Sequence, residues 1–278
     1  MNEWALLVLT VAVPAAVGGM LFLWFAQLLL KKKGEELFSM MKWPLIILAV
    51  ISVIGLFASF FHLGKPIHAL NAVRGFGRSW MSNEIVVTGL FIAMACITAG
   101  LALVQKKINP TLMLITGIVG LADIFCMAEL YRVTRVNGWD TLNTFLVFYG
   151  TAFTLGPVLG ASLLIKTMEG GALRKIMKWA FAIGIFGVAI QLIGTAMFNG
   201  YIADTQLINT ISASEKLEGY TSFIGIRWVI EAIGLAVIGY LALSSGKKKA
   251  NYTLIYASLA VFLVAEGMSR YVFYVLGA

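Results

Sequence analysis

Eight apolar segments, each long enough to cross a lipid bilayer as a helix, constrain this chain more than any other feature of its sequence. A membrane-spanning helix needs about 20 mostly apolar residues, because the hydrocarbon core of the bilayer is about 30 Å thick. Only helices and closed barrels satisfy their own backbone groups in lipid. The segments lack the strict alternation of barrel strands. The sequence therefore predicts an all-α integral membrane protein with eight transmembrane helices. The spans are expected at about 4–30, 41–63, 84–105, 110–131, 142–166, 177–198, 222–244 and 252–276.

The composition agrees with this fold class. Hydrophobic residues make up 60% of the chain and charged residues 12%, whereas a soluble domain has about 25% charged residues. No connection is long enough for a separate folded domain, so we expect residues 1–278 to form a single membrane domain. The first span continues to Leu30, well past the apolar core of a signal peptide, and is expected to stay in the membrane.

The connections between the spans are of two kinds, and the two kinds alternate. One kind is short and basic, at 31–33, 106–107, 174–178 and 247–249, and the other is longer and mixed in charge, at 64–83, 132–141 and 199–221. Lys and Arg accumulate in cytoplasmic loops. We therefore expect both termini on the outer side of the membrane. The net charge of +8 is then explained by the basic residues of the cytoplasmic loops, and no nucleic-acid partner is expected.

Two small features bear on helix packing. The run from Gly156 to Gly160 predicts a close approach of two helices. Glu129 with Arg132 ends the fourth predicted span, and Glu266 with Arg270 ends the eighth. This faint repeat would fit two four-helix bundles.

Charged side chains inside the predicted spans need an explanation, because each costs about 2.5–3.5 kcal/mol at mid-bilayer. With the topology above they all lie toward the outer side, which predicts a polar cavity open to that face. Its residues are Asp123, Glu129, Arg132, Arg227, Glu231, Glu266 and Arg270.

A structural role is the alternative for several of these residues. Arg227 with Glu231, and Glu266 with Arg270, have the i,i+4 spacing at which side chains on one helix neutralise each other. Glu129 and Arg132 can form a pair at a helix end. Asp123 has no such partner on its own helix, so we expect it to be protonated or paired across helices.

The stretch 59–84 contains several titratable side chains between two apolar runs. It holds both histidines, His62 and His68, and the carboxylate Glu84. An imidazole ordinarily titrates near neutral pH, so it suits the oxidation of a quinol, which releases two protons, and a carboxylate can share that role. We predict His62 and Glu84 as the catalytic pair. The predicted quinol-binding residues around them are Lys65, Asn71, Arg74, Arg78 and Ser82.

Redox cofactors held by this chain are not expected. Two histidines close together on one side of the membrane do not provide the axial pair of a bis-histidine haem, and Cys96 with Cys126 cannot supply the four ligands of an iron–sulfur cluster. We expect no haem, no iron–sulfur cluster, no flavin and no metal site.

The stretch also resembles a known family. The run His62-Leu63-Gly64-Lys65-Pro66, closed by Ser79-Trp80-Met81-Ser82-Asn83-Glu84, is similar to the anchor subunit (DmsC) of bacterial dimethyl sulfoxide reductase, within the polysulfide reductase and NrfD-like membrane subunits. Tyr131-Arg132 with Trp139-Asp140-Thr141 continues the resemblance. The closing run departs from many relatives, which have a basic residue before the glutamate.

The resemblance implies a haem-free anchor in the bacterial cytoplasmic membrane. Such an anchor binds menaquinol or a similar quinone and passes electrons to an iron–sulfur subunit with four clusters, which supplies a molybdopterin catalytic subunit. His62 and Glu84 carry over as quinol-site residues. The terminal substrate would bind on that catalytic subunit.

Two other functions are weighed against this one. The first is a proton-coupled secondary transporter that uses Asp123, Glu129, Glu231 and Glu266 as a relay. Transporters favour helices broken at matched positions of two repeats, and Pro14 and Pro157 do not correspond. The second is a purely structural anchor without a quinol site. Purification separates the classes, because a quinol-oxidising anchor would co-isolate with coloured, molybdenum-containing partners.

Overall fold

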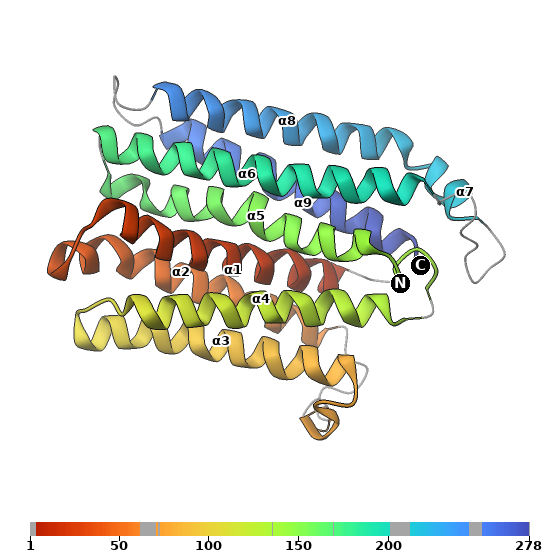
Figure 1. The fold of residues 1–278 in the computed structure, drawn as a ribbon, viewed down its shortest axis with the longest axis horizontal. Coiled ribbons are helices and arrows are strands. Elements are labelled where there is room, and N and C mark those ends of the chain that lie inside the picture. Colours follow the sequence, from red (N-terminus) through yellow and green to blue (C-terminus); the bar gives the residue numbers. More distant parts are fainter. Residues whose placement is uncertain are drawn as a thin grey trace.

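The protein is described by a computed structural model, which places residues 4–61, 71, 73–134, 136–168, 170–200, 212–244 and 252–277. Within these residues eight helices are long and apolar enough to cross a membrane, which confirms the predicted fold class (Figure 1). They are α1 (Trp4–Leu30), α2 (Gly34–Phe60), α3 (Trp80–Gln105), α4 (Pro110–Arg132), α5 (Leu142–Leu164), α6 (Gly170–Asn199), α8 (Thr221–Ser244) and α9 (Tyr252–Val275).

Three helices begin earlier than the apolar segments predict. Less apolar residues extend α2, α3 and α6 at their starts, since a helix can continue past the hydrocarbon core. In α2 the added first turn carries Glu35 and Glu36, where carboxylates interact favourably with the helix dipole. A short helix, α7 (Ala213–Glu218), was not predicted; the Ser212 hydroxyl caps it by accepting from the backbone N–H of Glu215 at 3.1 Å.

The spanning helices form two groups of four, in agreement with the faint sequence repeat. Helices α1 to α4 pack around one another, and α5, α6, α8 and α9 form the second group (Figure 1). Helices α1 and α5 pack directly across the boundary and are the most buried spans. The molecule therefore has one continuous apolar core that extends through both groups.

The contact between α1 and α5 depends on glycine. A Cβ atom added to Gly156 would lie 2.5 Å from the Cα of Gly18, and one added to Gly18 would overlap the carbonyl oxygen of Ala152. Only residues without a side chain allow the two backbones to approach this closely. The predicted close approach at Gly156 is thus confirmed.

The start of α1, the end of α9 and α7 lie at the same end of the bundle (Figure 1). The α1–α2, α3–α4 and α5–α6 connections lie at the opposite end. Most of the charged side chains buried within the spans gather in two places, one in each helix group.

Candidate functional site

Part of the predicted quinol site is outside the described residues. His62 and Lys65 both belong to this part, as does most of the short helix expected after Pro66. The structure describes Asn71, Arg74 and Arg78 on the α2–α3 connection and Ser82 and Glu84 on α3.

The end of the α2–α3 connection folds back on the first turn of α3. The backbone N–H of Gly77 donates to Oδ1 of Asn83 at 2.7 Å, and those of Arg78 and Ser79 donate to the carbonyl of Gly75 at 2.9 and 3.0 Å. Ser82 packs against Gly75 so closely that a Cβ atom there would overlap the Ser82 hydroxyl. Ser82 is consequently buried.

This fold-back leaves an exposed surface at the start of α3. Arg74 and Arg78 are exposed there, together with the apolar side chains of Val73 and Phe76. A surface that mixes Arg with large apolar side chains is typical of a protein–protein interface.

Two carboxyl groups are buried beside each other in the first helix group. Glu84 of α3 is 9% exposed and Asp123 of α4 is 0% exposed, and they are close enough to interact electrostatically. Asp123 accepts a hydrogen bond from Thr88 at 2.6 Å through Oδ1, whereas its Oδ2 has no partner within the described part of the chain. Neither carboxyl group forms an ion pair with any described residue. Of the two alternatives for Asp123, protonation or a partner on another helix, the structure shows a hydroxyl partner on α3 and no cation among the described residues.

Two tyrosines join this carboxyl pair to the second helix group. The hydroxyl of Tyr131 lies 2.8 Å from that of Tyr274, and Tyr274 also contacts the Thr10 hydroxyl at 3.0 Å. Tyr131 is close enough to Glu84 for an electrostatic interaction. The ring of Trp139 packs on Tyr131, and its Nε1–H donates to the carbonyl of Phe273 at 2.7 Å.

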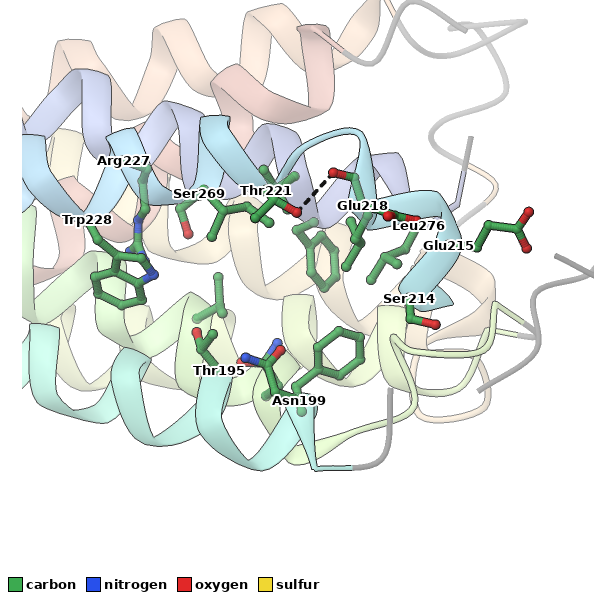
Figure 2. A pocket seen from close by; sticks show the side chains of 17 residues that line it. Thr195, Asn199, Ser214, Glu215, Glu218, Thr221, Arg227, Trp228, Ser269 and Leu276 are labelled. Atoms are coloured by element: carbon green, nitrogen blue, oxygen red, sulfur yellow. Dashed lines mark hydrogen bonds between the residues drawn. The ribbon is translucent and has the colours of Figure 1, made fainter. Parts of the chain in front are cut away.

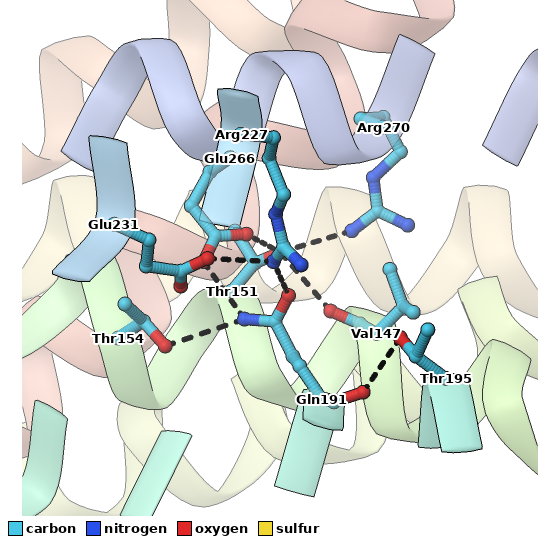
Figure 3. A network of polar contacts seen from close by, with 9 residues as sticks. All are labelled: Val147, Thr151, Thr154, Gln191, Thr195, Arg227, Glu231, Glu266 and Arg270. Atoms are coloured by element: carbon cyan, nitrogen blue, oxygen red, sulfur yellow. Dashed lines mark hydrogen bonds and ion pairs between the residues drawn. The ribbon is translucent and has the colours of Figure 1, made fainter. Parts of the chain in front are cut away.

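A larger polar network fills the core of the second helix group (Figure 3). Arg227 and Glu231 of α8 form an ion pair at 2.9 Å, as their spacing predicts. Gln191 of α6 accepts a hydrogen bond from Nη2 of Arg227 and donates to Oε1 of Glu266 at 2.8 Å. One amide therefore bridges a cation on α8 and a carboxylate on α9.

Glu266 and Arg270 of α9 do not form the direct ion pair that their spacing allows. The hydroxyl of Thr151 lies between them, 2.8 Å from Oε2 of Glu266 and 3.2 Å from Nη2 of Arg270. Arg270 is fully buried, and its guanidinium carbon lies 3.7 Å from the centre of the Phe148 ring. Helix α5 thus places the Thr151 hydroxyl between Glu266 and Arg270 and packs the Phe148 ring against the guanidinium group.

Glu129 and Arg132 form a pair at the end of α4, as expected. Arg132 contacts both carboxylate oxygens at 2.5 and 2.7 Å. Glu129 is buried, but Arg132 is substantially exposed, so this pair lies at the edge of the helix group and apart from the network around Gln191.

A cavity of about 580 Å³ lies between α5, α6, α7, α8 and α9 (Figure 2). Arg227 and Thr195 connect it to the polar network, and Phe198, Trp228 and Phe273 form aromatic walls. Glu215 and Glu218 of α7 also line it, and both are exposed. Beside α7, a hydrogen bond to Tyr271 raises the pKa of Tyr220.

The two buried polar groups differ in what they can do chemically. Glu84 and Asp123 have no described cation, so either carboxyl group can take up a proton without breaking an ion pair. The network around Gln191 contains two guanidinium and two carboxyl groups, and with Thr151 it is suited to holding four helices, α5, α6, α8 and α9, together. Within the described residues no group of three or more His, Cys, Asp or Glu could hold a metal ion.

Sequence reasoning missed several members of these groups. Gln191 is an amide in an apolar span, a signal that could have been noticed. Thr151 and Tyr274 gave no local signal, because threonine and tyrosine are common in spans and their partners are distant in the chain.

Comparison with known proteins agrees with this architecture. The model of the DMSO reductase anchor subunit (DmsC) family matches residues 1–276. A relative from Haemophilus influenzae, a component of its anaerobic dimethyl sulfoxide reductase, is 30% identical over 98% of this chain and 94% of its own length. The corresponding component of the Escherichia coli enzyme is 28% identical over the same shares. A component of the sulfite dehydrogenase from Allochromatium vinosum is 28% identical over 53% of this chain and 49% of its own.

No solved structure gives a significant match. The family match nevertheless covers all eight helices of a multi-pass membrane protein, from α1 to the end of α9. The chain therefore belongs to the DMSO reductase anchor subunit family.

Proposed function

We propose that the chain is the membrane anchor and quinol-oxidising subunit of a dimethyl sulfoxide reductase-like complex, and that the quinol binds between the α2–α3 connection and the start of α3. The observation that carries the proposal is the pair of buried carboxyl groups, Glu84 and Asp123. Glu84 lies in the first turns of α3, directly after the connection whose sequence holds His62, and no described cation neutralises either carboxyl group.

The chemistry follows from what a quinol releases. Oxidation removes two electrons and two protons from the head group, so the site needs two proton acceptors. We assign the first proton to the imidazole of His62 and the second to the carboxylate of Glu84. Lys65, Asn71 and Ser82 orient the head group, and Asp123 receives protons beyond Glu84.

The electrons leave through a partner subunit. The exposed surface of Arg74 and Arg78 with Val73 and Phe76 supports docking of a protein at the start of α3. In this proposal the partner is an iron–sulfur subunit with four clusters, which passes the electrons to a molybdopterin catalytic subunit. The anchor itself carries no haem, cluster or flavin, and menaquinol is its substrate.

The site would face the outside of a bacterial cytoplasmic membrane. The basic residues at 31–33 and 106–107 join helices at the bundle end opposite the start of α3, and those at 174–178 lie in the first turns of α6 at the same end (Figure 1). Because basic loops stay in the cytoplasm, both termini and the quinol site lie on the outer side.

Substitution of the two histidines tests the proposal. In the assembled complex, His62→Leu should abolish quinol-driven reduction and leave reduction driven by a soluble viologen dye unchanged, since the dye delivers electrons directly to the partners. His68→Leu is the matched control and should retain quinol-driven turnover. Unchanged quinol-driven turnover in an assembled His62→Leu complex would refute the assignment.

A further inference from the structure

The cavity lined by α5 to α9 belongs to no function proposed above. Glu84 and Asp123 lie on α3 and α4, in the other helix group, whereas the cavity is enclosed by the second group and α7 (Figure 2). Its volume of about 580 Å³ falls within the range of roughly 300–1,000 Å³ that small-molecule sites occupy. The cavity can therefore hold a ligand of ordinary small-molecule size.

The walls favour a flat ring. Phe198 of α6, Trp228 of α8 and Phe273 of α9 line the cavity from three different helices. Aromatic side chains stack on, or pack edge-on against, a planar ring with a geometry that an acyl tail does not offer. Three such walls therefore favour an aromatic ligand over a lipid tail.

Two residues that line the cavity each carry a polar atom without a partner in the described part of the chain. Oδ1 of Asn143 and Nε of Arg227 are buried and make no hydrogen bond with any described residue. A buried polar atom without a partner costs about 1–3 kcal/mol. The two atoms are an acceptor and a donor, so a ligand hydroxyl could serve both and a ligand carbonyl could serve the arginine.

The charges around the cavity favour an uncharged ligand. The charge of Arg227 is already met by Glu231 at 2.9 Å, so the arginine does not require an anion. Glu215 and Glu218 of α7 place two carboxylates on the exposed side of the cavity, where they would repel an anion. A cation that passed them would then meet Arg227.

We propose that this cavity is a second ligand site, which binds an uncharged planar ring bearing hydroxyl or carbonyl oxygens. The ring stacks against the aromatic walls, and its oxygen atoms contact Arg227 and Asn143. The ligand is either the head group of a membrane quinone or a tail-free aromatic compound of the same chemistry. The site needs no electron transfer and does not depend on the quinol site at Glu84.

Photolabelling of the assembled complex tests this site. The probes are an azido-naphthoquinone and the same compound with a prenyl tail, followed by peptide mapping. Labels are expected on residues 214–228 or 269–276, and excess unlabelled naphthoquinone should suppress them. Labelling by the prenylated probe alone would identify a membrane quinone as the ligand, and equal labelling by both would identify the ring as sufficient.

Two serine variants show whether the photolabelling depends on binding in the cavity. Ser269→Trp places a large ring in the cavity and should reduce labelling there by about tenfold, a loss of about 1.4 kcal/mol. Ser222→Trp is the matched control on an exposed position of α8 and should not change it. Labels confined to residues around 60–90 would overturn this inference and support the site at Glu84. Labels confined to the cavity would support the second ligand site and contradict the quinol site at Glu84.

Discussion

The hydroxyl of Tyr131 on α4 contacts the hydroxyl of Tyr274 on α9 at 2.8 Å, and this pair is one of the polar links between the two helix groups. On one side Tyr131 is within electrostatic reach of Glu84. On the other, Tyr274 interacts electrostatically with Arg270. Buried polar side chains therefore extend from the first carboxyl pair to the network around Gln191.

Removal of the Tyr274 hydroxyl should lower the stability of the folded protein modestly. Tyr274→Phe loses the contacts with Tyr131 and Thr10, and hydrogen bonds between membrane helices contribute about 0.6 kcal/mol each on average. We expect the free energy of unfolding in mixed detergent to fall by about 1 kcal/mol. Tyr256→Phe removes an exposed hydroxyl from the same helix and should leave stability unchanged; an equal loss in both variants would contradict the role of the link.

Neutralising Glu84 should separate quinol oxidation from the chemistry of the partner subunits. Glu84→Gln removes a proton acceptor, and general acid–base groups typically contribute 10²–10⁴-fold, so quinol-driven turnover should fall by about that factor. Viologen-driven turnover should be unaffected. Glu129→Gln alters a buried acid of α4 that is already paired with the exposed Arg132, and quinol-driven turnover in this control should stay near the wild-type rate.

The ion pair between Arg227 and Glu231 is suited to a double-mutant cycle. Breaking a buried pair from either side leaves an uncompensated charge, which costs about 3–5 kcal/mol, whereas replacing both partners by apolar residues can be nearly neutral. Arg227→Met and Glu231→Met should each be strongly destabilising. The double variant should lose less free energy of unfolding than the two single variants lose together. If the losses added strictly, the two residues would act independently.

The contact between α1 and α5 should not tolerate a methyl group. In Gly156→Ala the new Cβ would lie 2.5 Å from the backbone of Gly18, so the helices must separate, at a cost of about 1–3 kcal/mol. Gly89→Ala on α3 meets no atom within 4 Å and should be neutral or slightly stabilising, because alanine favours a helix. Thermal denaturation in detergent compares the two, and similar melting temperatures would contradict the close approach.

Quinol oxidation through this subunit should not generate a membrane potential. If His62 and Glu84 release protons on the side where the partner receives electrons, no net charge crosses the bilayer. A voltage-sensitive dye in proteoliposomes should stay unresponsive during quinol-driven reduction, while a valinomycin-induced potassium potential gives a full signal. A turnover-dependent response would show that protons cross the membrane.

The sequence predicted the features that depend on local patterns. Apolar runs located the spans, although α2, α3 and α6 extend beyond them because hydropathy does not mark where a helix ends. The spacing of Arg227 and Glu231 predicted their ion pair, and the small residues at Gly156 predicted a close approach.

Features that depend on distant segments were not predictable in this way. Glu266 and Arg270 have the same spacing as Arg227 and Glu231, yet Thr151 of α5 lies between them. The contact of Tyr131 with Tyr274 joins residues far apart in the sequence. The cavity depends on α7, a short helix in the connection between α6 and α8, and the composition of that connection did not predict a helix.

The central place of α1 has a consequence for biogenesis. This helix is synthesised before the other seven spans, yet it packs against α2, α4, α5 and α9. Its Thr10 hydroxyl donates to the Leu6 carbonyl within the helix, but it finds its side-chain partner on Tyr274 of α9. A nascent polypeptide released early would therefore present part of α1 to the translocon and to lipid, and quality-control proteases could recognise it. Complete burial of the first span has to wait for insertion of the last.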